Sequence, residues 1–331
     1  MEIKKLVSPS SEDQIKKHWK HKDKVYISCV CITYNQSKYI RDTIDGFLAQ
    51  ITQYRFEIII HDDASIDDTH KILIEYKEKF PSIIKLILQK ENQYKLGKKI
   101  TPLAVNYSCG KYVAICEGDD YWIDKFKLEK QASILELHED CNIVISRAIS
   151  LYHDNTTSLF CDLGGQQKNI DFDNCIIGPK KDFFSPATFF IRRCVFQKLP
   201  AWYYDFAPVG DYYLFLYASH KSGAIYIPDT TSVYRRESTG SWSETNKSDG
   251  FTQIYKRLEC SILLKKTLCK VNSKALITRA LNHYLGYFMR NIFNKGSLSK
   301  NIKLIMHIFF TYPSLLYRLP LHYIKKTYAK E

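Results

Sequence analysis

Hydrophobic positions in the first half of the chain alternate between short continuous apolar runs and helical spacing. The apolar runs predict strands, and the segments between them, where apolar residues recur at i, i+3 and i+4, predict helices. The predicted strands are 25–33, 56–61, 83–89, 111–116 and 141–146. The predicted helices are 39–50, a helix capped by Asp67 or Asp68 that runs through Phe80, 101–108 and about 124–138. Continuous apolar runs suit strands that are buried on both faces. This alternation predicts an α/β domain with a mostly parallel central sheet flanked by helices.

The alternation ends near residue 150. Residues 151–182 are rich in Asn, Asp, Gly and Thr and predict irregular structure or a hairpin. Beyond them the pattern predicts strands at 187–192 and 224–228, a helix at 212–219, and helical structure from Phe251. We therefore expect a polar leader at 1–24 (loose or a short helix), a main domain at 25–250 with halves at about 25–146 and 147–250, and a basic helical extension at 251–331.

The positive charge of the protein lies in its last quarter. The chain has a net charge of +13, and residues 251–331 hold 15 basic and 2 acidic residues, which leaves 33 of each sign in 1–250. A nucleic-acid-binding domain would carry its basic footprint on the folded body, so we expect no nucleic-acid partner. The basic extension also contains short apolar stretches, which suits an anionic membrane surface. The alternative is a pair of helices that packs on the main domain.

Localisation signals are few. The N-terminal residues reach no apolar segment before Lys24, which predicts no signal peptide, and no run reaches the roughly 18 apolar residues of a membrane span. The ten cysteines form no CxxC pair, which favours free buried thiols in a reducing compartment. We expect a cytoplasmic protein that is peripheral on the inner face of the cell membrane.

Polar residues follow three predicted strands: Thr33-Tyr34-Asn35, Asp62-Asp63 and Asp119-Asp120. The carboxyl ends of strands in an open α/β sheet meet at one edge, where ligands bind. Adjacent carboxylates repel unless a cation neutralises them, and carboxylate oxygens suit Mg²⁺ or Mn²⁺. An Asp-rich turn is the alternative. The sequence has no GxGxxG and no GxxxxGK[ST], which weighs against dinucleotide cofactors and P-loop hydrolysis.

Three segments occur in a fixed order: SCVCITYN at 28–35, EIIIHDDASIDDT at 57–69 and GKYVAICEGDD at 110–120. Together they resemble glycosyltransferase family 2. The resemblance extends over about residues 24–245. It implies the GT-A fold and the transfer of a sugar from a nucleotide diphosphate with inversion at the anomeric carbon.

The resemblance also implies roles for the donor side of the site. Thr33, Tyr34 and Asn35 would bind the donor nucleotide, with Asp63 holding a uracil base. Asp119 would face the ribose or the sugar. Asp120 would bind the Mn²⁺ or Mg²⁺ ion that bridges the diphosphate. The first half of the main domain would then be the nucleotide-binding half.

The acceptor half is implied by two further segments. Residues 185–188, Ser-Pro-Ala-Thr, resemble the floor of the acceptor side. Asp211 stands where the family carries its catalytic Asp, so it is our candidate general base. The alternative for Asp211 is the N-cap of the predicted helix 212–219.

One segment departs from the family pattern. Residues 234–243 resemble a loop that commonly reads Tyr-Arg-x-His, and here Glu237 takes the place of the His. Glu237 is either an altered metal ligand or simply exposed. Arg235 and Arg236 could supply the missing positive charge to the phosphates.

Together these features predict an inverting, metal-assisted glycosyltransferase with a nucleotide-sugar donor, UDP-linked by expectation. The acceptor would be a hydroxyl of a surface-polysaccharide or lipopolysaccharide glycan, carried on a lipid. The alternatives are a nucleotidyltransferase acting on a sugar phosphate, which would need a Gly-rich basic loop after the first strand, and a non-catalytic membrane adaptor that uses the basic extension.

Overall fold

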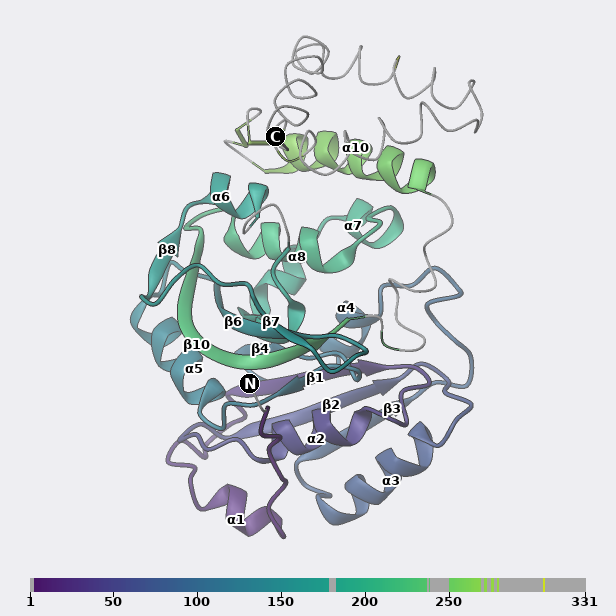
Figure 1. The fold of residues 1–331 in the computed structure, drawn as a ribbon, viewed down its shortest axis with the longest axis vertical. Helices are drawn as coiled ribbons and strands as arrows, with labels where there is room; N and C mark the ends of the chain where they lie inside the picture. The colour runs from purple at the N-terminus through teal and green to yellow at the C-terminus, as the bar shows by residue number, and fades with distance from the viewer. Residues whose placement is uncertain are drawn as a thin grey trace.

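The structure is a computed structural model that describes residues 3–178, 183–236, 238, 250–268, 271–272, 275–276, 279 and 306. Strands and helices alternate in its first half, as the hydrophobic pattern predicts (Figure 1). The strands are β1 Ile27–Thr33, β2 Phe56–Asp62, β3 Ile84–Leu88, β4 Tyr112–Ile115, β5 Tyr121–Trp122, β6 Ile143–Leu151, β7 Thr157–Phe160, β8 Lys168–Ile170, β9 Phe190–Arg192 and β10 Ala224–Arg235. The helices are α1 Glu12–Lys16, α2 Ile40–Leu48, α3 Thr69–Lys79, α4 Ile100–Val105, α5 Lys127–Leu137, α6 Phe172–Ile177, α7 Ala201–Asp205, α8 Gly210–Ser219 and α10 Gly250–Thr267, with short 3-10 helices η2 Pro186–Thr188 and η3 Arg193–Lys198.

A single sheet with the strand order β3-β2-β1-β4-β9-β6-β10-β5 runs through the molecule, with β7 beside β6 and β8 beside β10. Strands β3, β2, β1 and β4 are parallel, and so are β6 and β10. The short β9 joins the two parallel groups because it pairs antiparallel with both β4 and β6. Most paired residues therefore belong to parallel ladders, as predicted.

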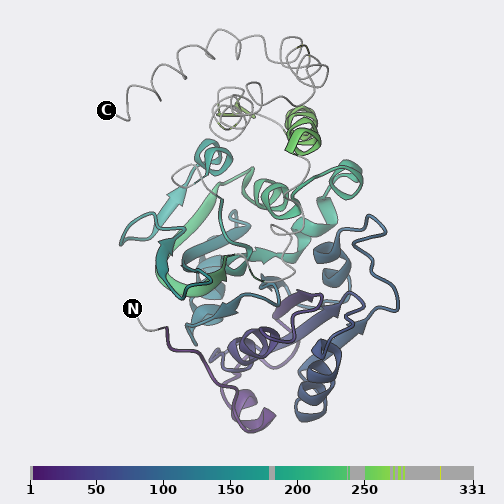
Figure 2. The same cartoon turned by 45° about the vertical axis from the view of Figure 1, so that its right-hand side comes forward.

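Alternate residues of the central strands enter two different hydrophobic clusters. Val30 and Ile59 face the cluster that includes α4 and α8, whereas Cys29 and Ile58 face the cluster that includes α2, α3 and α5. Figures 1 and 2 show these two helical layers on either side of the sheet. Helices on both faces explain why β1 and β2 are apolar along almost their whole length.

The leader is integrated into the fold. Helix α1 forms within it, and Ile15 and Trp19 are buried in the same cluster as α2 and α3. Glu12 accepts hydrogen bonds from the backbone and hydroxyl of Ser82, at 2.7 and 2.5 Å. Of the two predictions for this segment, the short helix is confirmed for residues 12–16.

The second half contains elements that the pattern did not predict. Residues 151–182 include the β6–β7 hairpin, β8 and α6, so the predicted hairpin is present but the segment is more ordered than expected. Strand β10 extends to Arg235, beyond its predicted end at Pro228. Its pairing with β6 shifts register between Ile227 and Ser232, and this irregularity carries the strand past Pro228.

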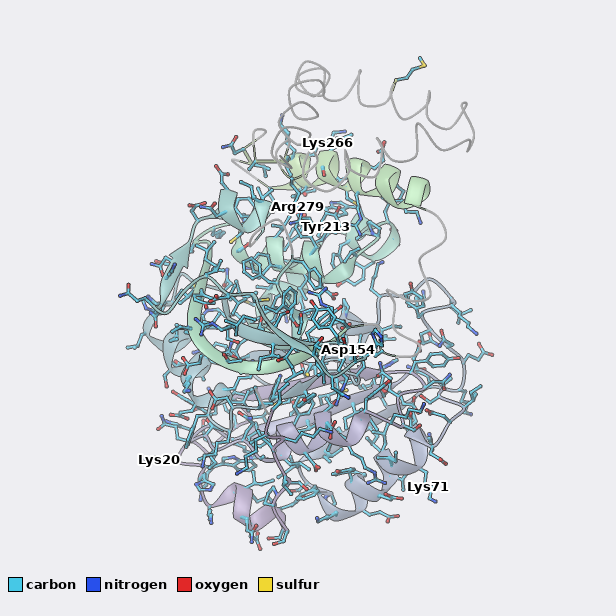
Figure 3. The ribbon with its side chains drawn as sticks, viewed as in Figure 1. Lys20, Lys71, Asp154, Tyr213, Lys266 and Arg279 are labelled. Atoms are coloured by element: carbon cyan, nitrogen blue, oxygen red, sulfur yellow. The ribbon has the colours of Figure 1, made fainter. Side chains whose placement is uncertain are left out.

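The first part of the basic extension packs on the main domain. Cys260 and Leu264 of α10 are buried in the cluster that contains α8. The Tyr217 hydroxyl lies 2.6 Å from the Thr267 hydroxyl, and the Tyr213 hydroxyl donates to the carbonyl of Arg257 at 3.4 Å. Figure 3 shows Tyr213 between α8 and α10. Residues 280–305 and 307–331 lie outside the described residues, so their predicted membrane contact does too.

No helix within the described part of the chain is long and apolar enough to cross a membrane. The nine cysteines that the structure describes form no disulfide with one another, and seven of them are buried, as the prediction of buried thiols requires, whereas Cys109 and Cys194 are exposed.

Candidate active site

The three predicted polar segments follow neighbouring strands. Strands β2, β1 and β4 lie side by side and are parallel, so Asp62-Asp63, Thr33-Tyr34-Asn35 and the turn 117–120 all leave the sheet at one edge. Their convergence, which the sequence could only predict, is therefore confirmed.

The loops after β1 and β2 are bonded to each other. Asp63 donates its backbone N–H to the carbonyl of Thr33 at 3.0 Å. The Asn35 side chain accepts from the N–H of Ile66 at 2.8 Å, and its own N–H donates to the Ser65 hydroxyl at 2.9 Å. Asn35 adopts a positive φ of 53°, a backbone region that Asn tolerates better than most residues. Asn35 therefore joins these two loops, while Tyr34 beside it is half-buried.

The carboxylate of Asp63 holds a third loop. Its two oxygens accept hydrogen bonds from the backbone N–H groups of Gln93 and Tyr94, at 2.7 and 3.0 Å. Each carboxylate oxygen has two lone-pair positions, so one more donor could still approach. Asp63 is thus a structural link whatever else it binds.

The turn after β4 packs tightly against the end of β1. A Cβ atom at Gly118 would lie 2.4 Å from the Gln36 Oε1 atom and 2.8 Å from the Thr33 hydroxyl oxygen. Only glycine allows this close approach. The Thr33 hydroxyl and Gln36 Oε1 are buried without a hydrogen-bond partner among the described residues, so both polar atoms lie unsatisfied beside the turn.

Asp119 and Asp120 are buried in the turn and point to different partners. Asp119 accepts a hydrogen bond from the Ser238 hydroxyl at 2.5 Å. The Oδ1 atom of Asp120 accepts from the backbone N–H of Arg235 at 2.8 Å, whereas its Oδ2 atom is buried without a partner in the described part of the chain. Burial, followed by the neighbouring charge of Asp119, raises the pKa of Asp120 well above its usual range.

The donor set of this turn fits a hard divalent cation. Two carboxylates, one with an unsatisfied oxygen, are the kind of ligands that Mg²⁺ or Mn²⁺ takes while leaving its other positions to water and phosphate. No group of three or more His, Cys, Asp or Glu side chains among the described residues could hold a metal by itself. A cation here would take its remaining ligands from water or from a phosphate-bearing substrate.

Asp211 lies in the first turn of α8, and the N-cap of this helix is Val209. The N-cap alternative for Asp211 is therefore wrong. Burial raises the pKa of Asp211 to about 6, and the positive charge of Lys99 opposes that rise. Asp211 in turn contributes, after burial, to holding the pKa of Glu117 well above its usual range. Asp211 therefore interacts electrostatically with Glu117, which belongs to the turn that carries Asp119.

Two charged neighbours of Asp211 had no role in the sequence analysis. Glu117 stood within a quoted motif without an assigned function, and Lys99 had no signal at all. Lys99 precedes α4 and donates a hydrogen bond to the carbonyl of Ala207, in the loop before α8. Spacing along the chain cannot reveal Lys99, because 112 positions separate it from Asp211.

The two arginines at the end of β10, Arg235 in the strand and Arg236 directly after it, both have partners. Arg236 donates to the Ser150 hydroxyl at 3.0 Å, and its guanidinium lies 4.4 Å from the ring centre of Phe160 and 4.9 Å from that of Tyr234. Arg235 forms an ion pair with Asp42. A contact between either guanidinium and a diphosphate would have to replace or share these interactions. Glu237 lies outside the described residues.

The Ser-Pro-Ala-Thr segment at 185–188 is buried and forms η2. The Trp122 indole donates to the carbonyl of Ala187 at 3.0 Å, and the Gln131 amide donates to that of Thr188 at 2.9 Å. These bonds join the segment to β5, which follows the Asp119–Asp120 turn, and to α5.

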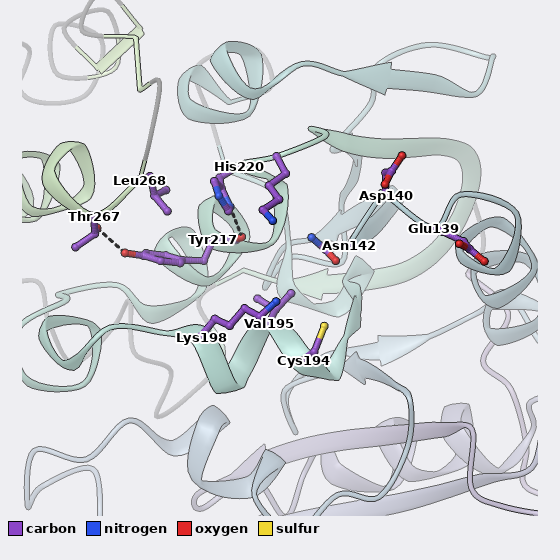
Figure 4. Close-up of a pocket in the computed structure, with 11 residues that line it drawn as sticks. Glu139, Asp140, Asn142, Cys194, Val195, Lys198, Tyr217, His220, Thr267 and Leu268 are labelled. Atoms are coloured by element: carbon purple, nitrogen blue, oxygen red, sulfur yellow. Dashed lines mark hydrogen bonds between the residues drawn. The ribbon is translucent and has the colours of Figure 1, made fainter.

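A separate cavity of about 370 Å³ lies at the opposite edge of the sheet (Figure 4). Cys194 and Asn142, which line it, adjoin the end of β9 and the start of β6, and Arg192 at the end of β9 pairs with the first residue of β4. The side chains of His220 and Lys198 also line it. This cavity is therefore distant from the Asp119–Asp120 turn.

Comparisons with known proteins agree with this architecture. The protein Rv1520 of Mycobacterium tuberculosis is 32% identical over 221 residues, which are 65% of this chain and 60% of that relative. The chain thus spans about 60% of the length of this curated relative. The Escherichia coli enzyme named UDP-Glc:alpha-D-GlcNAc-diphosphoundecaprenol beta-1,3-glucosyltransferase WfaP is 32% identical over 110 residues, 33% of this chain and 41% of WfaP.

Among solved structures, residues 1–349 of Staphylococcus aureus TarS in complex with UDP-GlcNAc superpose with a TM-score of 0.69. The match covers 92% of this chain and 88% of that one at 16% sequence identity. It shows a shared fold, the GT-A fold that the sequence motifs predict. A family model, Glycosyl transferase family 2, matches residues 28–199, just over half of the 331 residues. The chain therefore belongs to glycosyl transferase family 2.

Proposed function

We propose that this protein is an inverting glycosyltransferase that moves a sugar from a nucleoside diphosphate to a hydroxyl of a surface-polysaccharide acceptor. The observation that carries the proposal is that Asp119 and Asp120 follow β4 at the carboxyl-end edge of the sheet, and that Asp211 contributes to the raised pKa of Glu117 in the same turn. Asp119 and Asp120 suit a cation and a diphosphate, while Asp211, with a pKa of about 6, suits a general base.

The donor is a nucleotide sugar that binds at the ends of β1 and β2. Thr33, Tyr34 and Asn35 line the base pocket in this proposal, and Asp63 accepts the imide N–H of a uracil through a free lone pair. A UDP-linked donor is supported by two relatives, because TarS was crystallised with UDP-GlcNAc and WfaP is named for UDP-Glc.

Asp120 would hold a divalent cation, with Asp119 beside it facing the ribose or the sugar. Mn²⁺ or Mg²⁺, when bound, supplies positive charge to the diphosphate leaving group. The unsatisfied Oδ2 atom of Asp120 supports this assignment. Glu237, as an altered metal ligand, stays a prediction.

Asp211 takes the proton of the acceptor hydroxyl. The hydroxyl oxygen forms a bond to the anomeric carbon as the bond from that carbon to the diphosphate oxygen breaks, so the configuration inverts. The nucleoside diphosphate leaves with the electron pair of the broken bond. Lys99 favours the ionised form of Asp211, which is the form that can accept a proton.

The acceptor is a glycan on a lipid carrier or lipopolysaccharide core. The name of WfaP, which specifies a diphosphoundecaprenol acceptor, supports this class. The basic extension 251–331 would hold the enzyme at an anionic membrane surface on the cytoplasmic side. One face of α10 packs on α8, so the face of α10 that is turned away from α8 would meet the membrane.

A turnover panel tests the proposal. Purified protein is incubated with UDP-, GDP- and dTDP-linked sugars, Mn²⁺ or Mg²⁺, and a lipid-linked glycan acceptor, and release of the nucleoside diphosphate is measured. We expect one donor to turn over, and Asp211→Asn to abolish that turnover.

The matched control is Asp205→Asn, which changes an exposed carboxylate at the end of α7 and should keep wild-type activity. Lack of turnover with every donor would overturn the proposal. Release of pyrophosphate from a nucleoside triphosphate and a sugar phosphate would favour a nucleotidyltransferase instead.

A further inference from the structure

Arg235 contacts three separate elements around the Asp119–Asp120 turn. It is the last residue of β10, and its backbone N–H donates to Asp120 Oδ1 at 2.8 Å. Its Nη1 atom donates to the backbone carbonyl of Asp119 at 2.5 Å, and its Nη2 atom donates to the carboxylate of Asp42 on α2. Its side chain is only 10% exposed. One residue therefore joins β10, the turn and α2.

Aromatic rings fix the plane of the same guanidinium. It lies 4.3 Å from the ring centre of Tyr121, which follows the turn, and 5.0 Å from that of Tyr39, which precedes α2. Stacking on aromatic faces is typical of Arg and leaves its fork of N–H donors free to bond in the plane. The rings thus hold the fork in the orientation that reaches Asp42 and Asp119 together.

Helix α2 holds the turn a second time through the next residue. The Thr43 hydroxyl lies 2.5 Å from the carbonyl of Asp120 and 3.1 Å from that of Gly118. Thr43 therefore binds the backbone of the turn directly, while Asp42 binds it through Arg235. The second cation on Asp42 is Lys5, at 2.7 Å, with a side chain that is 54% exposed.

We propose that the Asp42–Arg235 ion pair is a clamp that positions the Asp119–Asp120 turn for the cation and the donor. The inference rests on the proposed function, and it assigns Asp42 and Arg235 as positioning residues. It differs from a diphosphate contact by Arg235, because a guanidinium shared between Asp42, the Asp119 carbonyl and two rings would have to leave Asp42 to reach a phosphate.

The two roles of Arg235 predict opposite results for Asp42→Asn. Under the clamp, losing the Asp42 charge loosens the turn, so we expect kcat to fall about tenfold and the Mn²⁺ concentration for half-maximal rate to rise. Under direct diphosphate binding, the same change frees the guanidinium, so the donor KM would fall while kcat and the half-maximal Mn²⁺ concentration stay the same. That result would overturn the clamp.

Arg235→Lys provides the conservative variant. Lysine keeps the charge but cannot bond Asp42 and the Asp119 carbonyl with one fork, so we expect no rescue. The double variant should lose little more than either single one, because both remove the same interaction. Fully additive losses would contradict the clamp.

The matched control is Glu75→Gln, which breaks an exposed Arg–carboxylate pair between α3 and α2, with Arg41, at 2.7 Å. It should leave activity unchanged. Hydrogen exchange of peptides that span 117–122 gives a readout that needs no turnover: we expect faster exchange in Asp42→Asn than in Glu75→Gln, and equal exchange would overturn the clamp. If the wild type turns over no donor, the proposed function fails. The hydrogen-exchange data still show whether the Asp42–Arg235 ion pair holds the turn.

Discussion

The Asp119–Asp120 turn and Asp211, which is coupled to that turn through the pKa of Glu117, have different surroundings. The Asp119–Asp120 turn is held by Arg235, Thr43 and Ser238. No hydrogen bond from the described part of the chain reaches the carboxylate of Asp211, and its main charged neighbour is Lys99.

The difference lies in hydrogen bonding, because burial raises the pKa of both Asp120 and Asp211 but only the turn is fixed by several hydrogen bonds from the described residues. Carboxylates that face a cation and a diphosphate must stay in place, so hydrogen bonds to their backbone and side chains are useful. A general base must gain and lose a proton near the working pH, and burial with few hydrogen bonds raises its pKa toward that range. Neighbouring carboxylates can therefore serve different steps because the fold surrounds them differently.

The largest expected effect is the loss of the base. Asp211→Asn keeps the size of the side chain but removes the proton acceptor, so we expect turnover to fall by about 10³-fold. Donor binding should persist, since Asp211 lies outside the proposed donor pocket. Initial rates and the donor-induced thermal shift measure the two effects, and turnover within about tenfold of wild type would remove Asp211 from its role.

The next largest effect is expected from Asp119 and Asp120. We expect Asp119→Asn and Asp120→Asn each to lower turnover by about 10²-fold, because each removes a charge that would face the cation or the sugar. The thermal shift caused by Mn²⁺ and nucleoside diphosphate together should shrink in Asp120→Asn. Asp140→Asn, beside the cavity at the opposite sheet edge, is the control. Unchanged metal dependence in Asp120→Asn would argue against a metal at this turn.

A smaller effect tests how tightly the turn is packed. Gly118→Ala would place a Cβ atom 2.4 Å from Gln36 Oε1 and force the turn away from β1. We expect the free energy of unfolding to fall by about 1–3 kcal/mol, measured by urea denaturation. Gly165→Ala is the matched control, since a Cβ atom there meets nothing within 4 Å. Equal stability of the two variants would show that the turn tolerates displacement.

The smallest effect is a shift in pH dependence. The base works when deprotonated, so turnover should fall as the pH drops through about 6, the pKa of Asp211. Lys99 lowers that pKa, so Lys99→Met should move the acidic limb of the profile to higher pH and reduce turnover at pH 6 about two- to threefold relative to pH 8.5.

The Lys99→Met variant keeps the other titratable groups near Asp211 and Lys99. Glu117 and Tyr203 are near Asp211, and Lys256 of α10 is near Lys99. Lys98→Met, which changes the exposed neighbouring lysine, should leave the profile unchanged. An equal loss at pH 6 and pH 8.5 in Lys99→Met would indicate a structural role for Lys99, through its bond to Ala207, and no effect on the base.

Much of the first half of the fold could be predicted from the chain. Strands β1, β2 and β4 lie close to their predicted positions, because a strand buried on both faces needs a continuous apolar run. The second half was harder to predict. Strand β10 runs past Pro228 and the leader packs through Ile15 and Trp19, and both depend on partners distant in sequence.

The sequence by itself determined the alternation of strands and helices, the polar ends of three strands and the candidates Asp63, Asp119, Asp120 and Asp211. Only the tertiary structure decided what surrounds each carboxylate. Asp42 and Lys99 had no local signal, because Asp42 meets Arg235 across 193 positions and Lys99 meets Ala207 across 108. Charge interactions depend on distance and burial, and both are set by the folded chain.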